Sequence, residues 1–312
     1  MRIFVLILAA ISMFFACTGI ASAGATGKVT AKIIDENGVP IQGADAEVTF
    51  EFAKAKGTGL DTKGERGITD NDGLFTTTGQ GMASISVSAM KDGYYMSCRG
   101  YEFKSSSMLL NRWEPWNPTI EVVLKKKRNP VAMYMKGTDW IEVPARESQV
   151  GYDLEKGDWV APYGKGATSD FVFTFKSNIR AFREYDLEMI LRFSNKLDGI
   201  QEYLFNPKEQ SLFKWPFEAP VNGYKSELIK EIHKTPGKSE TDINRGANYI
   251  FRVRTQSDEK GRITSTKYGK VASEFELSPD GSKFMVRFFY YLNPDTTRNL
   301  EEDPKKNLFK KK

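Results

Sequence analysis

The densest group of acidic and aromatic residues lies between positions 152 and 159. It contains Asp153, Glu155 and Asp158, with Trp159 directly after them. If the segment is a strand, Asp153 and Glu155 share one face. Carboxylates beside a tryptophan suit sugar-binding and glycoside-cleaving sites, because acids hold hydroxyls or transfer protons while the ring stacks on a pyranose. We predict ligand-binding roles for these four residues; the alternative is a turn with solvated acids and a packed Trp159.

Two more tryptophans, Trp113 and Trp116, lie in a phrase that also contains Pro115 and Pro118. Each proline fixes its own φ, so the phrase is rigid and could present aromatic rings to a ligand. We add Trp113 and Trp116 to the predicted ligand-binding residues. The alternative is that these rings fill an interface between two domains.

Residue types for catalysis are scarce. His233 is the only histidine, and Cys17 and Cys98 are the only cysteines. A catalytic triad or a thiol–imidazole pair would have to use His233, and zinc sites normally draw on several His or Cys. We expect His233 to face solvent near the end of a short polar helix. No catalytic residue, cofactor or metal is predicted, which favours a non-catalytic protein.

The segment 70–73, Asp-Asn-Asp-Gly, offers hard oxygen ligands of the kind that calcium prefers. The EF-hand spacing would need an acid at position 68, which is Ile68. The same residues suit a tight turn before Leu74 and Phe75. We predict the turn rather than a metal site.

The N-terminal 23 residues have the pattern of a secretory signal: Arg2, then an apolar run, then small residues ending at Ala23. The run is too short for a membrane span, which takes about 20 apolar residues. We predict cleavage after Ala23 and export to the periplasm or the extracellular space, with no transmembrane segment. The alternative is a lipid anchor at Cys17. Cleavage leaves Cys98 alone, and we expect it to be a buried small hydrophobe rather than a nucleophile.

The chain carries 45 basic and 40 acidic residues, interspersed along its length. This mild balance gives no electrostatic footprint for nucleic acid. Basic residues cluster at 125–128 and at 310–312. We interpret these clusters as a solvated junction and a frayed end, with contact to an anionic surface or polysaccharide as the alternative.

Turn residues recur roughly every ten positions, with alternating or aromatic-rich runs between them, which indicates sandwiches or barrels. We predict an all-β chain with a loop over 56–67 and one helix over 226–234, begun by Ser226 and stopped by Pro236 and Gly237. The clearest predicted strands are 27–35, 46–52, 83–89, 119–124, 171–175, 185–193, 249–255, 274–277 and 283–292.

Two motifs carry a family resemblance. The pattern G-x-P-I-x-G-A at 38–44, followed by T-D-x-x-G-x-F at 69–75, resembles the carboxypeptidase regulatory-like domain, a transthyretin-like β-sandwich. The resemblance covers residues 27 to about 90 and extends to 124 by strand count. It implies a stabilising or docking module and brings no catalytic residues. The phrases within 291–309 resemble the endings of exported bacterial proteins that carry such a domain in front.

The predicted organisation is a signal peptide at 1–23, a carboxypeptidase regulatory-like sandwich at 24–128, a second, larger β-sandwich-like domain at 129–304, and a basic tail at 305–312. We predict an exported, non-catalytic binding protein of the cell envelope or secreted space that contacts carbohydrate or a surface protein. One alternative is a carbohydrate-active enzyme with acidic catalysis in the second domain. The other is a purely structural or assembly protein.

Overall fold

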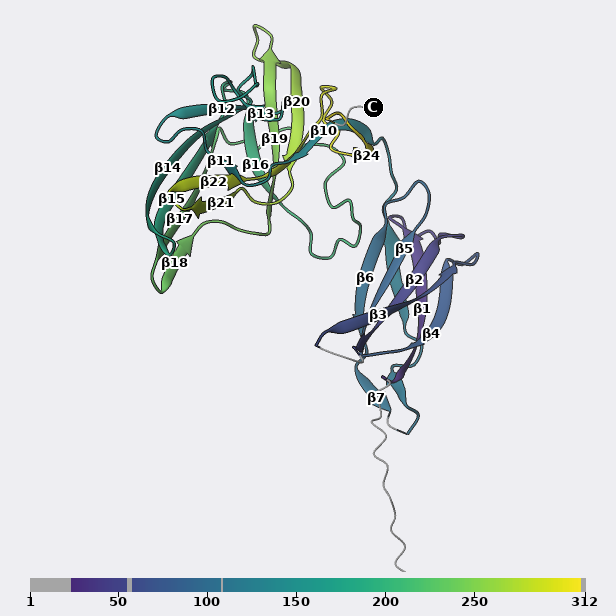
Figure 1. Ribbon diagram of the computed structural model, residues 1–312. Coiled ribbons are helices and arrows are strands. Elements are labelled where there is room, and N and C mark those ends of the chain that lie inside the picture. The colour runs from purple at the N-terminus through teal and green to yellow at the C-terminus, as the bar shows by residue number, and fades with distance from the viewer. Residues whose placement is uncertain (1–23, 55–57, 108, 310–312) are drawn as a thin grey trace, which may run out of the picture. The chain divides into compact units, whose positions relative to one another are not determined.

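The computed structural model describes residues 24–54, 58–107 and 109–309 (Figure 1). The predicted signal peptide, with Ala23 and Cys17, lies outside these residues. The described chain forms two compact units. Unit 1 comprises the described residues up to Lys126 together with Gln210–Leu212. Unit 2 comprises Lys127–Glu209 together with the described residues from Phe213 onward. The described residues contain strands and no helix, so the predicted all-β class is confirmed.

The described residues of unit 1 form two sheets. In the first sheet, β1 (Thr26–Asp35) lies between β4 (Leu74–Gln80) and β9 (Thr119–Leu124), and the start of β1 also joins β8 (Arg112–Glu114), which pairs with β7 (Ser105–Ser107). The second sheet has the order β3 (Leu60–Ile68), β2 (Asp45–Ala53), β5 (Ser84–Met90), β6 (Ser97–Glu102).

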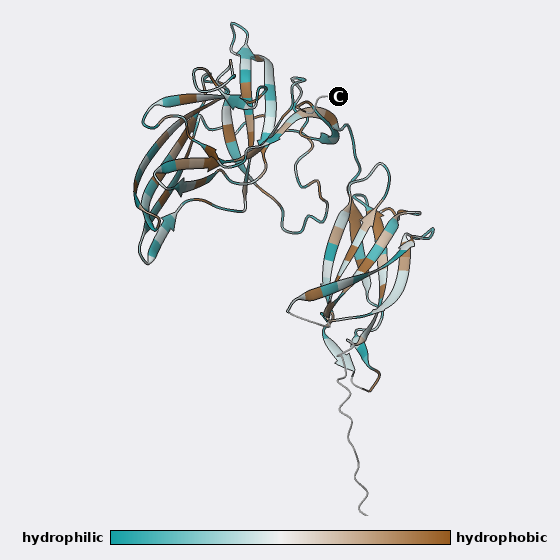
Figure 2. Cartoon of the chain, in the orientation of Figure 1, coloured by the Kyte–Doolittle hydropathy of each residue, from teal (hydrophilic) through white to brown (hydrophobic). Residues whose placement is uncertain are grey.

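The core of unit 1 is a single cluster of apolar side chains contributed by both sheets. Strand residues alternate between buried and more exposed positions, so each sheet turns one apolar face inward. Apolar bands therefore alternate with polar ones along the strands in Figure 2. The fully buried members include Val29, Ala31, Val48, Val87 and Val122.

The predicted turn at 70–73 is confirmed. One carboxylate oxygen of Asp70 accepts hydrogen bonds from the backbone N–H groups of Asp72, at 3.0 Å, and Leu74, at 2.8 Å. Gly73 has φ +73°, a conformation that side chains with a Cβ rarely adopt. The motif that carried the family resemblance therefore has a local structural role: it starts β4.

Two predictions in unit 1 were wrong. The segment predicted as a loop over 56–67 contains β3, whose side chains are mostly polar and exposed, as is typical of an edge strand. Such a strand lacks the alternation of apolar and polar residues from which a strand is predicted. Cys98 is exposed rather than buried, because on β6 the neighbouring Ser97 takes the inward position.

A short segment from much later in the sequence also belongs to unit 1. Ser211 forms an isolated antiparallel bridge with Ser97, at the start of β6. The N–H of Cys98 donates to the carbonyl of Gln210 at 3.0 Å. The chain therefore passes between the two units three times rather than once.

Unit 2 contains three sheets. The first has the order β13 (Asp158–Trp159), β12 (Gln149–Asp153), β14 (Phe171–Ala181), β15 (Glu184–Arg192), β17 (Glu227–Thr235), β18 (Lys238–Thr241). The second has the order β16 (Gly199–Leu204), β19 (Ala247–Ser257), β20 (Ile263–Val271), β23 (Phe289–Leu292), β10 (Val131–Gly137), β24 (Glu302–Asn307). The third has the order β11 (Ile141–Glu142), β22 (Lys283–Arg287), β21 (Glu276–Asp280).

The core of unit 2 is rich in aromatic rings. Phe171, Phe173 and Phe175 alternate along β14 and turn inward, where they meet rings from other strands. The ring centroid of Phe288 lies 5.9 Å from that of Phe173, and Phe284 packs edge-on against Phe175 at 5.2 Å. Inward alternation of this kind leaves the opposite face of the β14–β15–β17 sheet to polar side chains.

The predicted helix over 226–234 was wrong, because this segment is β17. It pairs with β15 along eight residues, from Glu227 to Lys234. Pro236 and Gly237 form a two-residue turn into β18, with Gly237 at φ +88°. Leu228 and Ile232 are spaced as on a helix face, but pairing with the neighbouring strand β15 overrides that local preference.

The predicted strand over 283–292 is split. β22 pairs with β11 and β21, whereas β23 pairs with β10 and β20, so the chain changes sheets at the buried Phe288. The segment predicted as a basic tail from residue 305 is still strand as far as Asn307. Among the described residues, no helix is long and apolar enough to cross a membrane.

Candidate functional site

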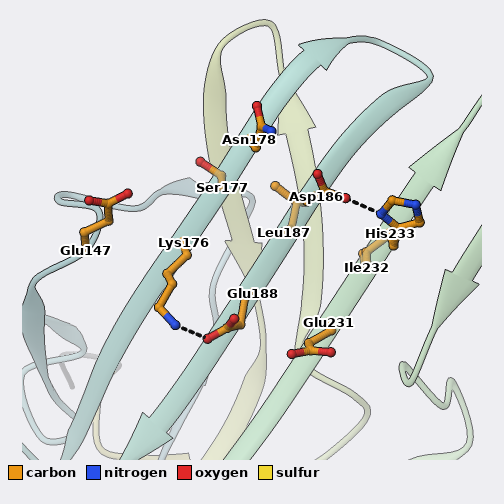
Figure 3. Close-up of a pocket in the computed structure, with 10 residues that line it drawn as sticks. All are labelled: Glu147, Lys176, Ser177, Asn178, Asp186, Leu187, Glu188, Glu231, Ile232 and His233. Atoms are coloured by element: carbon orange, nitrogen blue, oxygen red, sulfur yellow. Dashed lines mark hydrogen bonds and ion pairs between the residues drawn. The ribbon is translucent and has the colours of Figure 1, made fainter.

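The outer face of the β14–β15–β17 sheet carries a hollow of about 360 Å³, which we call the sheet-face hollow (Figure 3). Successive strand residues point to opposite faces, so the inward residues of these strands pack in the core while the polar ones face the hollow. Ten residues line it: Glu147, Lys176, Ser177, Asn178, Asp186, Leu187, Glu188, Glu231, Ile232 and His233.

One row across the three strands is dominated by carboxylates. Lys176 lies opposite Glu188, and its Nζ donates to the Glu188 carboxylate at 2.7 Å. Glu188 also lies opposite Glu231, a like-charge pair that a sheet would normally avoid. In the described part of the chain, the Glu231 carboxylate has no hydrogen-bond or ion-pair partner. This exposed carboxylate is therefore open to solvent and to a ligand.

The next row combines an amide, a carboxylate and an imidazole. Asn178 lies opposite Asp186, which in turn lies opposite His233 and contacts its Nδ1. Arg180 donates to the second Asp186 oxygen at 2.8 Å. The side-chain hydrogen bonds from Arg180 and His233 hold the pKa of Asp186 below its usual value, so this carboxyl is ionised at neutral pH.

Glu147 stands at the rim on the loop before β12. Its backbone has φ +59°, an uncommon conformation for a residue with a Cβ, and its N–H donates to the carbonyl of Phe175 at 2.8 Å. The loop is thereby fixed to β14. Among the described residues, no partner of the exposed Glu147 carboxylate is found, so a second solvent-accessible carboxylate borders the hollow.

The charge of the hollow limits what it can hold. Four carboxylates border it, and Lys176 is the only lysine or arginine among its lining residues. Ionised carboxylates accept hydrogen bonds and donate none, so they suit hydroxyl or ammonium groups and repel anions. Within residues 24–54, 58–107 and 109–309, no group of three or more His, Cys, Asp or Glu is placed to hold a metal ion.

The predicted site residue Asp153 lies at the end of β12 and is buried. Its two oxygens accept hydrogen bonds from four backbone N–H groups, those of Glu155, Lys156, Ala167 and Thr168. Burial raises the pKa of Asp153, but these donors outweigh it and leave the pKa below the usual value. The carboxylate therefore joins two stretches of loop.

Arg254 gathers Asp153 and two other acids into an ion network, the Arg254 cluster (Asp153, Glu155, Asp170, Arg254 and Lys267). The guanidinium contacts both oxygens of the buried Asp170, at 2.7 and 2.9 Å, and Glu155 at 2.9 Å. Lys267 pairs with the other Glu155 oxygen. Hydrogen bonding to Asp170 holds the pKa of Arg254 above its usual range. All three acids therefore have cationic partners within the protein.

The remaining predicted residues of this segment are also engaged. Asp158 accepts the N–H of Trp159 at 2.9 Å and that of Lys165 at 2.9 Å. Trp159 is only 7% exposed, and its ring packs edge-on against Tyr152 and Phe173, with centroids 5.2 and 5.9 Å away. Trp159 is therefore packed among core aromatic rings, as the alternative to a ligand-binding role states.

Trp113 and Trp116 belong to unit 1, whereas the acidic segment at 152–159 belongs to unit 2. Trp113 stacks on Phe103 with centroids 6.2 Å apart, and its Nε1 donates to the carbonyl of Gly81 at 3.0 Å. Trp116 is 38% exposed, with the guanidinium carbon of Arg112 5.1 Å from its ring centroid. A ligand-binding role for Trp116 stays a prediction.

The residues of the sheet-face hollow were not singled out from the sequence. Glu188 and Glu231 are 43 positions apart, and they meet only because β15 pairs with β17. A signal was present in the charges that alternate with apolar residues along 184–192, which place several polar side chains on one face. Because residues 226–234 were predicted to be a helix, the third strand of this face, β17, was not expected.

Comparison with known proteins adds little. No family model and no curated protein matches the chain. Similar solved structures include 3-chlorocatechol 1,2-dioxygenase from Rhodococcus opacus, at 13% identity and TM-score 0.25, over 34% of this chain and 61% of that one. The shaft pilin SpaA from Lactobacillus rhamnosus GG is similar at 12% identity and TM-score 0.23, over 84% and 92%. A candidate carbohydrate-binding protein from Bacteroides uniformis is similar at 10% identity and TM-score 0.20, over 86% and 99%.

The chain spans less than two thirds of that dioxygenase. At such identities and TM-scores these neighbours assign no function.

Proposed function

We propose that this protein is an exported, non-catalytic binding protein whose unit 2 holds a neutral or amino-bearing glycan in the sheet-face hollow. The observation that carries the proposal is a pair of carboxylates without a partner among the described residues, Glu231 on β17 and Glu147 on the loop before β12, beside the half-exposed Asp186 and Glu188. Hydroxyl and ammonium groups of a glycan can replace water as hydrogen-bond donors to these carboxylates. Repulsion by the same charges disfavours acidic polysaccharides.

Unit 1 fits the proposal as an accessory module. Its T-D-x-x-G-x-F motif forms the turn before β4, which agrees with a carboxypeptidase regulatory-like sandwich used for stability or docking. Export rests on the N-terminal signal pattern. The mass of the protein recovered from the periplasm or medium tests export, because cleavage after Ala23 predicts a chain that begins at Gly24.

The binding test is retention of residues 24–312 on insoluble glycans: a neutral glucan, chitin, chitosan, peptidoglycan and an acidic alginate. We expect retention on a neutral or amino glycan and none on alginate. Glu231→Gln should weaken retention about tenfold, because a charged acceptor is worth more than a neutral one. The matched control is Glu227→Gln on the same strand, where Glu227 pairs with Arg192 outside the hollow. Retention on no glycan, or equal loss in both variants, would refute the proposal.

A second candidate function rests on the opposition of Glu188 and Glu231. Directly opposite residues on one sheet face have Cβ atoms about 4.5–5.5 Å apart, close to the roughly 5–5.5 Å between the carboxyl groups of retaining glycosidases. An enzyme would release reducing sugar from a retained glycan, and Glu188→Gln and Glu231→Gln would each abolish the release. A binding protein releases none.

A further inference from the structure

A second hollow in unit 2, of about 280 Å³, lies where the chain changes sheets between β22 and β23. We call it the corner hollow. It combines polar and charged side chains with the edges of aromatic ones, and the sequence analysis assigned it no role. Its lining residues are Gly137, Thr138, Asp139, Ser273, Glu276, Arg287, Phe288 and Phe289.

A tryptophan that does not itself line the corner hollow follows the lining residue Asp139 and contacts the lining residue Arg287. Trp140 is 38% exposed, and the guanidinium carbon of Arg287 lies 4.8 Å from its ring centroid. Arg287 lies opposite Glu276 on the neighbouring strand and contacts both oxygens of that carboxylate, at 2.8 and 2.7 Å. The ring and the carboxylate together fix the orientation of the guanidinium, so less side-chain entropy is lost when it binds a ligand.

The backbone around the corner hollow is held rigidly. Buried Thr138 accepts the N–H of Phe288 at 2.9 Å and donates to its carbonyl at 3.1 Å. Ser273 has φ +98°, far outside the usual range for a residue with a Cβ, and its N–H donates to Asn248 at 3.1 Å. Backbone outliers of this kind concentrate at ligand sites.

Spare hydrogen-bonding capacity remains in the corner hollow. Within the part of the chain that the structure describes, the Asp139 carboxylate has no partner. Arg287 uses one guanidinium nitrogen on Glu276 and keeps further N–H groups. Arg287 packs over one face of the Trp140 ring, so a ligand would have to stack on the opposite face, with the guanidinium and the Asp139 and Glu276 carboxylates as its polar neighbours. That set matches a pyranose, which has an apolar C–H face and hydroxyls around its edge.

We propose that the corner hollow is a second binding position for a hexopyranose ring, with Trp140 as the stacking platform and Arg287, Glu276 and Asp139 as hydroxyl partners. The inference rests on the proposed function for its ligand class, but it uses none of the residues of the sheet-face hollow. The structural alternative is a surface pair in which Trp140 merely packs on Arg287.

The experiment titrates the 24–312 protein with soluble glucose, glucosamine and N-acetylglucosamine oligosaccharides by calorimetry. Trp140→Ala should weaken binding about tenfold or more, and Trp140→Phe, which keeps a flat ring, should retain most of the affinity. The matched control is Trp116→Ala, which removes another 38%-exposed tryptophan that also contacts an arginine but lies in unit 1. Thermal melting of each variant shows that it is folded.

The outcomes separate the two proposals. Loss with Trp140→Ala and with Glu231→Gln supports both binding positions. Loss of oligosaccharide affinity with Trp140→Ala alone supports binding in the corner hollow and refutes binding in the sheet-face hollow. Loss with Glu231→Gln alone, or equal loss with Trp140→Ala and Trp116→Ala, overturns the corner hollow. Binding of none of the sugars overturns both.

Discussion

Unit 2 contains two groups of carboxylates with opposite surroundings. In the Arg254 cluster, Asp153 and Asp170 are buried, and backbone N–H groups and a guanidinium occupy their oxygens. In the sheet-face hollow, Glu231 is exposed and has no partner among the described residues, and Glu188 has Lys176 alone. Several carboxylates gather in both places. The difference is whether the protein has already used them.

The comparison separates two uses of the same side chain. A carboxylate surrounded by donors gains its free energy in the folded protein and has little left for a ligand. A half-exposed carboxylate with open lone pairs contributes little to folding and can accept new hydrogen bonds. Acidic density along a sequence, as at 152–159, therefore does not separate structural acids from binding acids. The two kinds of acid are distinguished by the hydrogen-bond and ion-pair partners that the folded protein places around each carboxylate.

The largest expected effect is in the Arg254 cluster. Arg254→Gln leaves Asp170 buried without its bidentate partner, so the free energy of unfolding should fall by about 3–5 kcal/mol in urea denaturation. Arg180→Gln is the matched control, because Arg180 also contacts two carboxylates but on the surface. It should cost at most about 1 kcal/mol. Similar losses in the two variants would contradict the distinction.

A smaller, pH-dependent effect is expected at Asp153. In Asp153→Asn, one acceptor oxygen becomes an amide donor that faces backbone N–H groups, so stability at pH 7 should fall by about 1–3 kcal/mol. The folded-state pKa of Asp153 lies below its unfolded value, so the ionised carboxylate stabilises the fold above pH 4 or so, and this stability is lost as pH falls through the folded pKa.

The stability difference between wild type and Asp153→Asn should therefore be complete at pH 7 and shrink below about pH 4. Urea midpoints measured from pH 3 to pH 7 provide the check. A difference that stays constant across this range would show that the carboxylate charge is not what joins the loops.

The smallest expected effect on stability is in the sheet-face hollow. Glu231→Gln removes a charge that lies opposite Glu188, so the free energy of unfolding should stay unchanged or rise by up to about 0.5 kcal/mol. Glycan retention by the same variant should nevertheless fall. A marked loss of stability would place Glu231 with the structural acids instead.

The sandwich architecture was predictable because its causes are local. Alternating runs such as 171–175 and 185–193 place one face inward whatever lies beyond them, and the 70–73 segment forms its turn with its own carboxylate and Gly73. Segments without that signal were lost. β3 is polar along its length, and β17 has apolar spacing that suits either a helix or a strand.

The candidate sites were not predictable, because they depend on contacts between residues far apart in the sequence. The sheet-face hollow depends on the pairing of β15 with β17 across an intervening strand and a long loop, and the corner hollow depends on a sheet change at Phe288. Neither pairing leaves a pattern in any single stretch of sequence. Trp159 shows the converse: its neighbours in sequence suggest a ligand site, while its neighbours in space are core aromatic rings.

The inclusion of Gln210–Leu212 in unit 1 affects how the protein can be synthesised and divided. The bridge between Ser97 and Ser211 joins residues more than a hundred positions apart, so unit 1 cannot be completed until much of unit 2 has left the ribosome. A gene fragment that stops after Lys126 would encode a first unit with one edge position at the start of β6 unfilled. Excising unit 1 as a single block up to Lys126 therefore leaves out Gln210–Leu212 and, with them, the bridge to Ser97.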